Sequence, residues 1–323
     1  MGLAGEPGYD YSHWSLHPVV QIMPDRFLQP GTLWPAILRQ TEHALRCGAL
    51  RPIETTQAVI EDGGVRFLVR QVSSLARKDQ DKARQRDASA AVNPFLPYDP
   101  DLFVADISDT HVALLNKFNV IDHHLLIVTR RFASQDALLD LADFEALLAC
   151  MAEFDAVAFY NGGAAAGASQ RHKHLQMVPL PLGPDGPALP IAPLLASARI
   201  NGPVGTVPGL AFAHAFAPLA LSSARVPGLA GIALALYRAL LDAVGVRAID
   251  VDGELQPSGP YNLLVTRLGM LLVPRSAECV EGISVNTLGF AGSFFVRDGA
   301  QMRIVERVGP MGMLGRVAGG VLV

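Results

Sequence analysis

Charged and aromatic side chains are scarce in this 323-residue chain: charged residues make up 17% and aromatic residues 7%, while 50% are hydrophobic. The formal net charge is -4 and the pI is near 6.1, which excludes the basic excess of a general nucleic-acid-binding protein. Any phosphate-binding site must therefore be local. The composition indicates a globular chain, long enough for a large core.

Cysteine is also rare, with Cys47, Cys150 and Cys279 far apart and no CxxC pair. This odd, widely spaced set argues against a zinc knuckle or a disulfide framework and predicts a reducing compartment. Apolar runs stay shorter than the roughly 18 residues that a membrane helix needs. Residues 1–14 show no basic region followed by an apolar run, so no signal peptide is expected. The prediction is a cytoplasmic protein without membrane or nucleic-acid partners.

The segment NGGAAAGASQRHKHLQMVPL, residues 161–180, combines a glycine loop with two histidines. Its last part reads as a strand, so His172, His174 and Gln176 should share one face, with Lys173 on the other. Glycines in the preceding loop allow backbone N–H groups to surround phosphate oxygens. The candidate residues of that loop are Asn161, Gly163, Gly167, Ser169 and Gln170.

Two other interpretations of the histidines are open. A histidine on a strand is often only structural, and a histidine pair can bind a metal ion. No cysteine or carboxylate lies beside the pair in sequence, which disfavours a metal site, and no protein metal ligand is predicted. A neutral imidazole can instead attack phosphorus and form a covalent intermediate. The order of polar residues in the segment favours this phosphorus chemistry.

The segment resembles the active-site motif of the histidine-triad superfamily, in the nucleotidyltransferase branch that includes galactose-1-phosphate uridylyltransferase. Gln176 stands where hydrolases of that superfamily usually carry a third histidine. More closely, GASQRHKHLQMVPLP resembles the diadenosine tetraphosphate (Ap4A) phosphorylases, also called ATP adenylyltransferases. The segments NPFLPYDPDLFVADIS, at 93–108, and HVALLNKFNVIDHHLLIVTRRF, at 111–132, extend the resemblance, which runs from about Gly48 to Met313. The metal ligands of the uridylyltransferases are not evident, which argues against that branch.

The resemblance implies an enzyme, a nucleotidyltransferase, that converts Ap4A and inorganic phosphate into ATP and ADP. It makes His174 the nucleophile that forms an adenylyl-histidine. His172 would orient His174 or contact the phosphate, and Gln176 would bind a non-bridging oxygen. Gln176 cannot donate a proton as a third histidine could. A divalent cation, expected to be Mg²⁺, would be bound mainly by substrate oxygens. The remaining implied nucleotide contacts are Asn116, Lys117 and Phe118, together with Lys78 at the base of a charged loop at 77–91. His124 is expected to be structural.

Two alternatives share this pocket. A dinucleoside polyphosphate hydrolase would pass the adenylyl group to water, and a nucleotide-binding sensor would not turn over. Gln176 argues against the first and the intact His174 against the second. The acceptor could be phosphate, sulfate or a nucleoside diphosphate. The oligomeric state and the preferred dinucleotide length stay open.

The expected fold is α+β: a histidine-triad-like, mostly antiparallel sheet with helices on one face, extended by a C-terminal α+β segment. The predicted domains are an N-terminal extension (1–34), a catalytic domain (35–182) and a C-terminal adenylyltransferase-like domain (183–323). Apolar periodicity predicts helices at 35–47, 134–154 and 225–247. The helix at 134–154 should begin at Ser134. Strands are expected at 65–72, 125–128, 156–160 and 175–178, with a hairpin at 261–274. Arg66 and Arg70 should share one face of the first strand, and a solvated face is favoured over a contact with phosphate.

Overall fold

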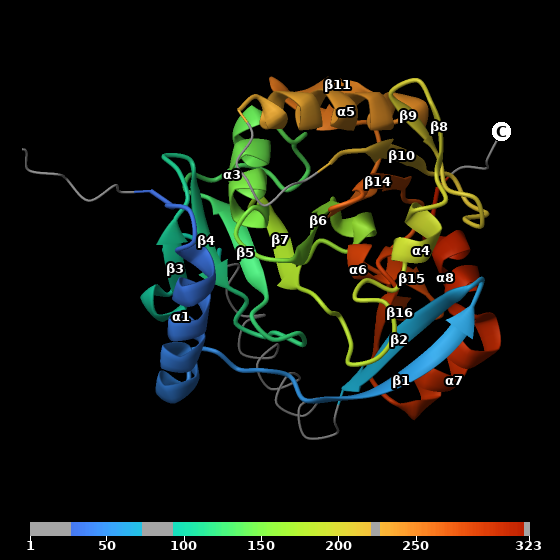
Figure 1. Cartoon of the computed structure of the whole chain (residues 1–323), viewed down its shortest axis with the longest axis horizontal. Helices are drawn as coiled ribbons and strands as arrows, with labels where there is room; N and C mark the ends of the chain where they lie inside the picture. Colours follow the sequence, from blue (N-terminus) through green and yellow to red (C-terminus); the bar gives the residue numbers. More distant parts are fainter. Residues whose placement is uncertain (1–26, 73–92, 221–226, 320–323) are drawn as a thin grey trace, which may run out of the picture.

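The computed structural model describes residues 27–72, 93–220 and 227–319, and Figure 1 shows their arrangement. The helical elements are α1 (Leu33–Cys47), η1 (Pro100–Leu102), α3 (Leu141–Met151), η2 (Ala164–Ala166), α4 (Ala192–Leu195), α5 (Leu229–Ala243), α6 (Thr287–Phe290), α7 (Gly299–Val308) and α8 (Pro310–Val317). The strands in the first half are β1 (Thr55–Asp62), β2 (Val65–Val72), β3 (Phe103–Asp106), β4 (His111–Leu115), β5 (Leu125–Thr129), β6 (Ala156–Gly162) and β7 (His174–Pro179). Those in the second half are β8 (Arg199–Asn201), β9 (Val204–Thr206), β10 (Ala215–Pro218), β11 (Ala248–Val251), β12 (Glu254–Pro257), β13 (Tyr261–Thr266), β14 (Gly269–Pro274), β15 (Cys279–Val280), β16 (Ile283–Ser284) and β17 (Ser293–Val296).

A large antiparallel sheet organises the described part of the chain. Its ten strands follow the order β3-β4-β5-β7-β6-β13-β14-β10-β9-β8. The pairing of β6 with β13 joins the two halves of the sequence, with Asn161 opposite Asn262. One sheet therefore runs across the predicted boundary at residue 182, while the division into domains stays a prediction.

Each face of this sheet is covered by a different layer. The first face packs its apolar side chains, such as Leu175 and Met177, with residues of α1, α3 and α5. The second face packs Phe159 and Val178 with α6, α7, α8 and a smaller sheet, β1-β2-β17. Figure 1 shows α7 and α8 beside the β1–β2 hairpin. The α+β fold is confirmed, but helices lie on both faces of the sheet rather than on one.

Most of the predicted elements are confirmed with shifted ends. Helix α1 spans Leu33–Cys47 and is capped by Gly48, whose left-handed φ of 79° lets its N–H bind the Leu45 carbonyl. Strands β2, β5, β6 and β7 match their predicted ranges within a few residues. The hairpin β13–β14 is also confirmed, and α5 is shorter at both ends than the periodicity predicted.

The helix expected from Ser134 begins seven residues later, at Leu141. Its cap is Asp140, which forms a capping box with Asp143. Ser134 instead makes a β-bridge with His172. The prediction failed because apolar spacing also occurs in residues 134–139, an irregular segment whose backbone binds the histidine strand.

The prediction of a solvated face for both arginines of β2 was wrong for Arg70. Arg66 is exposed and lies 3.4 Å from Glu61, whereas Arg70 is buried. The Arg70 guanidinium donates to Ser293 Oγ and to the Leu182 carbonyl. Burial lowers the pKa of Arg70. Parallel pairing of β17 on β2, invisible in local sequence, covers this end of the strand.

Among residues 27–72, 93–220 and 227–319, no helix has the length and apolar character to cross a membrane.

Candidate active site

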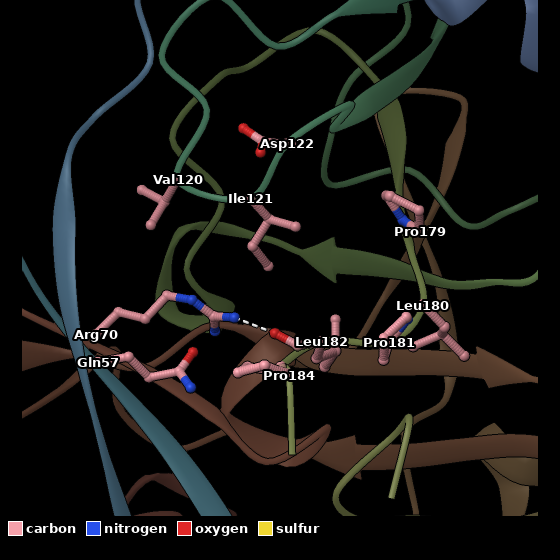
Figure 2. A pocket seen from close by; sticks show the side chains of 11 residues that line it. Gln57, Arg70, Val120, Ile121, Asp122, Pro179, Leu180, Pro181, Leu182 and Pro184 are labelled. Carbon is pink, nitrogen blue, oxygen red and sulfur yellow. Dashed lines mark hydrogen bonds between the residues drawn. The ribbon is translucent and has the colours of Figure 1, made fainter. Parts of the chain in front are cut away.

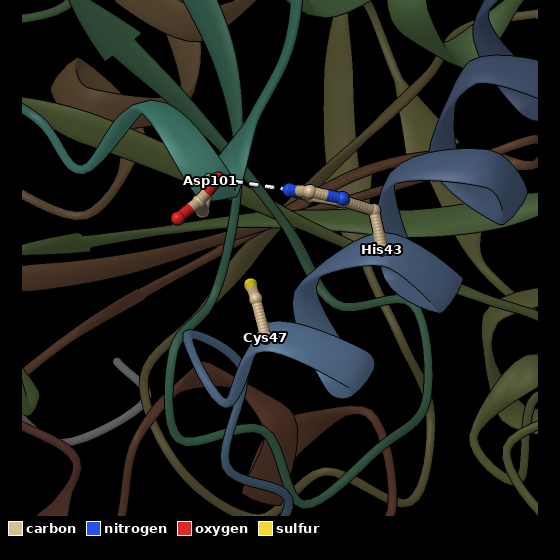
Figure 3. A group of neighbouring side chains, drawn as sticks. All are labelled: His43, Cys47 and Asp101. Carbon is tan, nitrogen blue, oxygen red and sulfur yellow. Dashed lines mark hydrogen bonds and ion pairs between the residues drawn. The ribbon is translucent and has the colours of Figure 1, made fainter.

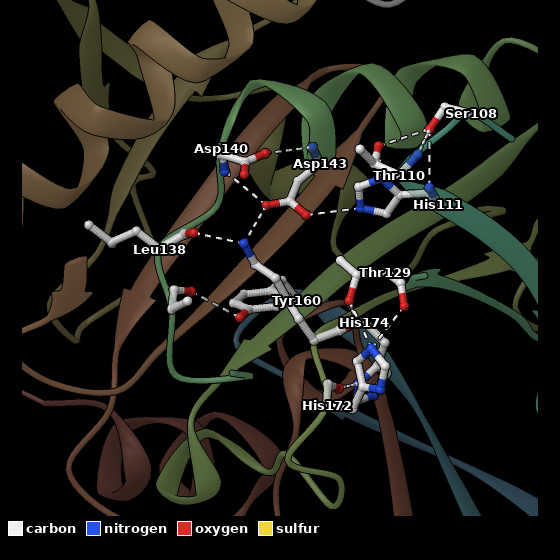
Figure 4. Close-up of polar contacts among 12 residues, drawn as sticks. Ser108, Thr110, His111, Thr129, Leu138, Asp140, Asp143, Tyr160, His172 and His174 are labelled. Carbon is white, nitrogen blue, oxygen red and sulfur yellow. Dashed lines mark hydrogen bonds and ion pairs between the residues drawn. The ribbon is translucent and has the colours of Figure 1, made fainter. Parts of the chain in front are cut away.

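Strand β7 and the two residues before it place the histidine motif near the middle of the large sheet, with β5 on one side and β6 on the other. His172 and His174 are buried, with 1% and 4% of their surface exposed, and Gln176 is half-buried. Figure 4 shows the two imidazoles close together beside Thr129. Lys173 forms its contacts with Asp143 and Leu138 instead, as the predicted alternation requires.

His174 has the tautomer that a nucleophile requires. Its Nδ1 lies 2.8 Å from the carbonyl oxygen of His172. A carbonyl only accepts hydrogen bonds, so Nδ1 carries the proton and Nε2 keeps its lone pair. Burial, with a contribution from nearby His172, lowers the pKa of His174 from 6.5 to about 4. The imidazole is therefore neutral at physiological pH and can attack phosphorus.

His172 uses both ring nitrogens within the protein. Its Nε2–H donates to the Thr129 carbonyl oxygen at 2.8 Å, and its Nδ1 accepts from Asn93 Nδ2 at 3.0 Å. Burial lowers its pKa as well. No lone pair of the ring stays available for attack, so this arrangement suits a residue that orients His174. The two histidines thus differ in the hydrogen bonds of their ring nitrogens.

Asn93 and Phe95 also contact the histidines, although no role in the site was predicted for them. The Phe95 ring lies with its centroid 5.7 Å from that of His172 and 5.3 Å from that of His174. Both residues belong to the segment NPFLPYDPDLFVADIS, which in the sequence only extended the resemblance to the family. A polar Asn followed by an aromatic residue in a motif shared with the family was the available signal.

His124 fixes the orientation of Gln176. The His124 Nε2–H donates to Gln176 Oε1 at 3.0 Å, and its Nδ1 accepts from Asn116 Nδ2 at 3.1 Å. Because Oε1 of Gln176 is used in this way, its amide nitrogen is the group left for a phosphate oxygen. His124 thus contacts a candidate phosphate-binding residue directly, and its structural role stays a prediction.

The loop 116–124 holds the other predicted nucleoside contacts. The Asn116 side chain is hydrogen-bonded to His124, while Lys117 Nζ lies 3.9 Å from Asp99 Oδ2. Phe118 is 36% exposed, which leaves its ring open to a base. The roles of these three residues toward a nucleotide stay predictions, and Lys78 lies outside the described residues.

The glycine loop follows β6 and turns through η2. Gly163 and Gly167 have φ of +96° and +90°, a region that side chains rarely adopt. A Cβ on Gly167 would also stand 2.9 Å from Cβ of Asn286, so glycine is required on two grounds. Ser169 is exposed and Gln170 half-buried. The loop has the geometry of a tight turn, and its contact with phosphate stays a prediction.

Asn161 anchors the start of this loop in the interior. Its Oδ1 accepts from Asn262 Nδ2 and from the Thr287 N–H, each at 3.0 Å, and from Thr287 Oγ1 at 2.7 Å. Arg275 also donates to Asn262. Residues from the C-terminal half therefore hold the loop in place. A direct contact of Asn161 with phosphate stays a prediction.

Gln135 links the histidine strand to the glycine loop. Its Oε1 accepts from the His174 N–H at 2.8 Å, and its Nε2 donates to the Asn161 carbonyl oxygen at 2.9 Å. One buried amide thus fixes both parts of the motif relative to each other. The apolar periodicity predicted a helix at Gln135, and no role in the site was predicted for it.

A buried charge network lies behind the motif, on the opposite face. Lys173 Nζ donates to Asp143 Oδ2 at 2.6 Å and to the Leu138 carbonyl at 2.8 Å. His111 Nε2 lies 3.0 Å from Asp143 Oδ1. Burial opposes ionisation of Asp143, but His111 and Lys173 outweigh it and lower its pKa. The network holds the residue between the two histidines.

A cavity of about 370 Å³ lies at the other end of β7 (Figure 2). Its lining includes the polar side chains of Gln57, Arg70 and Asp122, and it continues over Pro179 to Pro184. His174 and Pro179 are five residues apart on an extended strand, a separation of roughly 16 Å. The cavity thus lies at the C-terminal end of β7 and the histidines at its N-terminal end, with Gln176 between them.

We predict that burial of neutral histidines makes the fold acid-sensitive. The pKa of His124 falls to about 4, chiefly through burial, as does that of His174. A depressed folded-state pKa leaves stability complete above the ordinary value of 6.5 and removes it as pH falls toward 4. At pH 5 each such histidine lowers the free energy of unfolding by about 2 kcal/mol. Urea unfolding of wild type and His124→Gln at pH 7 and pH 5 measures this. The variant should lose about 2 kcal/mol less between the two pH values, and equal losses would contradict the assignment.

These features define a class: a site for transfer of a phosphorus-containing group through a buried, neutral histidine beside a glycine loop. Comparison with known proteins is more specific. Residues 23–197 match the model of the Ap4A phosphorylase N-terminal domain, and residues 208–319 match that of the ATP adenylyltransferase C-terminal domain. The chain belongs to the Ap4A phosphorylase family of nucleotidyltransferases.

Individual relatives agree with this placement. Diadenosine 5',5'''-P1,P4-tetraphosphate phosphorylase 2 of Saccharomyces cerevisiae is 28% identical over 254 residues, which cover 70% of this chain and 74% of the relative. The protein APA1 of the same yeast is 32% identical over 137 residues, or 40% and 42% of the two chains. The crystal structure of yeast Ap4A phosphorylase Apa2 shares the fold, with a TM-score of 0.73 and 22% identity over 90% of this chain and 95% of that one. A structure of Apa2 in complex with Ap4A gives a TM-score of 0.71 at 22% identity, over 90% of this chain and 98% of that one.

Proposed function

We propose that this protein catalyses the reversible phosphorolysis of Ap4A to ATP and ADP through an adenylyl-histidine. The observation that carries the proposal is the unprotonated Nε2 of His174, fixed by the bond from Nδ1 to His172 O. Family membership and the yeast Ap4A phosphorylase among the relatives are the basis for proposing Ap4A as the substrate. The substrates and products are Ap4A, inorganic phosphate, ATP and ADP.

The first step forms a bond between His174 Nε2 and the α-phosphorus of one adenosine. The bond from that phosphorus to its bridging oxygen breaks, and ATP leaves with the electron pair. The proton on Nδ1 stays against the His172 carbonyl, which stabilises the cationic ring of the intermediate. In the second step an oxygen of inorganic phosphate attacks the same phosphorus. The N–P bond breaks, its electron pair returns to Nε2, and ADP leaves with His174 neutral again.

Gln176 supports transfer to phosphate over hydrolysis. Its amide nitrogen, oriented by His124, can donate to a non-bridging oxygen, and donors of this kind contribute a few kcal/mol each to transition-state stabilisation. Unlike a third histidine, the amide cannot move a proton to or from an attacking water. Inorganic phosphate is already anionic and needs no such help. A dinucleotide hydrolase is therefore the less suited alternative.

The nucleoside is proposed to lie along the loop 116–124. Exposed Phe118 offers a ring surface for a base. The same loop contains Val120, Ile121 and Asp122, which line the cavity. The glycine loop at Gly163 and Gly167, with Ser169 and Gln170, would meet the phosphates from the other side. Lys78 is proposed to approach the polyphosphate.

A divalent cation, Mg²⁺, is proposed to accompany the polyphosphate. Mg²⁺ prefers carboxylate, phosphate and water oxygens. The groups around His174 are imidazoles, amides and a threonine hydroxyl, and the nearby carboxylate of Asp143 is bound to Lys173 and His111. These residues fit a cation carried mainly by substrate oxygens. The pattern of cysteines supports a cytoplasmic location.

Product analysis tests the proposed function. The protein is incubated with Ap4A and Mg²⁺, with and without inorganic phosphate, and nucleotides are separated by chromatography. ATP and ADP should appear together only when phosphate is present. ATP with AMP in the absence of phosphate would identify a hydrolase. Binding of Ap4A without turnover in either reaction would identify a sensor. Parallel reactions with sulfate or a nucleoside diphosphate determine which acceptors are used.

A further inference from the structure

A group of side chains whose chemistry suits metal binding lies away from the histidine motif, where α1 meets η1 (Figure 3). His43 and Cys47 are one turn apart on α1, so both project from the same side of the helix. Asp101 of η1 faces them. One ligand atom from each of the three residues lies within 4.8 Å of the others. Asp101 is 58 residues from His43 in sequence, which explains why no sequence pattern reveals the group.

Asp101 is held in place from several sides. Its Oδ1 lies 2.8 Å from His43 Nε2, and its backbone carbonyl accepts from Gln40 Nε2 at 2.6 Å. Its N–H donates to Asp99 Oδ1 at 3.1 Å, the cap of η1. Two donors on a rigid helix and a third on an anchored turn form a preorganised set. His43 and Asp101 have side-chain exposures of 46% and 48%, so an ion from solvent can reach them.

We propose that His43, Cys47 and Asp101 bind a divalent cation of borderline softness, with Zn²⁺ as the ion that their chemistry fits best. One imidazole, one thiolate and one carboxylate leave a fourth tetrahedral position for water. Zinc bonds of about 2.0–2.3 Å place ligand atoms about 3.3–3.8 Å apart, which small side-chain rotations can reach from the present spacing.

Binding of the ion releases protons. The Cys47 thiol, whose Sγ now lies 3.6 Å from the Ala44 carbonyl, must become a thiolate. The proton between His43 Nε2 and Asp101 is displaced, since Nε2 must offer its lone pair to the metal. Hard cations such as Mg²⁺, which prefer oxygen ligands, would not compete well for this set.

The position of the group links it to the candidate active site. Asp101 belongs to the same segment as Asn93 and Phe95, which contact His172 and His174. An ion bound here ties α1 to that segment. The site is separate from the proposed Mg²⁺, and its test does not depend on turnover of Ap4A.

Metal titration of the untagged, metal-free protein tests the proposal. Zn²⁺ binding is followed by calorimetry, and Co²⁺ binding by the absorption of a thiolate–cobalt bond. The variants are Cys47→Ser and His43→Ala. Cys279→Ser is the matched control, because Cys279 is also exposed and lies outside the group. Circular dichroism verifies the fold of each variant.

Wild type and Cys279→Ser should bind one equivalent of Zn²⁺ with the same affinity and show the thiolate–cobalt band. Cys47→Ser should lose the band, and either site variant should bind Zn²⁺ at least tenfold more weakly. Zn²⁺ should also slow alkylation of Cys47 in wild type but not in His43→Ala. Unchanged zinc affinity in Cys47→Ser, or a band lost only in Cys279→Ser, would overturn the proposal.

Discussion

Replacing His174 with alanine should reduce phosphorolysis of Ap4A by roughly 10⁴-fold or more, because removal of a covalent nucleophile leaves only binding and electrostatic stabilisation. The geometry favours this residue over His172 as the proposed nucleophile. Among the described residues, His174 Nε2 has no hydrogen-bond donor, whereas both ring nitrogens of His172 are used. His172→Ala should also impair the enzyme, by loss of orientation, but should still form the intermediate slowly.

A matched control exists elsewhere in the chain. His214 is buried, binds a carbonyl through Nδ1 at 2.8 Å as His174 does, and has a pKa lowered mainly by burial. His214→Ala should keep activity within a few-fold of wild type, provided that thermal unfolding shows the fold intact. This control separates loss of a nucleophile from loss of any buried imidazole.

The intermediate can be measured directly. Without inorganic phosphate, the wild type should gain the mass of one adenylyl group per active site when Ap4A is added, and addition of phosphate should release it as ADP. The adduct should be acid-labile, as expected of a phosphoramidate, and absent from His174→Ala. A His174→Ala protein that retains a tenth of wild-type activity would exclude the proposed mechanism.

Local pattern predicted much of the fold because the elements of the catalytic half follow clear periodicities. The run Leu125–Val128 and the hairpin around Leu268 became strands as expected. What failed depended on contacts between distant segments. Residues 134–139 have helical apolar spacing, but Ser134 makes a β-bridge with His172, and the chain then turns so that the Gln135 side chain binds the His174 N–H. Likewise, Arg70 is covered by Ser293, 223 residues away, which no window of sequence can show.

The candidate site likewise combines residues close together in sequence with residues from distant segments. His172, His174 and Gln176 occupy alternate positions of one short segment, so strand alternation alone predicted that they share a face. Their supporting residues come from other elements: Asn93 holds His172 from 79 residues away, and Gln135 holds His174 from 39. Sequence can suggest such partners only by asking what a buried polar residue must bind. Lys173 raises that question, since its face of β7 packs into the main core.

Removal of the partner of Lys173 is expected to cause the largest loss of stability. Lys173 and Asp143 have side-chain exposures of 5% and 1%, so Asp143→Ala leaves a buried ammonium whose one remaining partner among the described residues is the Leu138 carbonyl. Breaking a buried ion pair on one side costs about 3–5 kcal/mol. Lys173→Met should cost less, since His111 still binds Asp143. Urea unfolding at pH 7 measures both.

The double variant Lys173→Met/Asp143→Leu isolates the pair. Removing both charges leaves no unpaired ion, so it should be more stable than Asp143→Ala by about 2 kcal/mol or more. Lys117→Ala is the control for a surface pair, since Lys117 lies 3.9 Å from Asp99 in a partly exposed position, and it should cost less than about 1 kcal/mol. If Asp143→Ala cost no more than this control, Lys173 would have found another partner or deprotonated. The network would then not hold the strand between the two histidines.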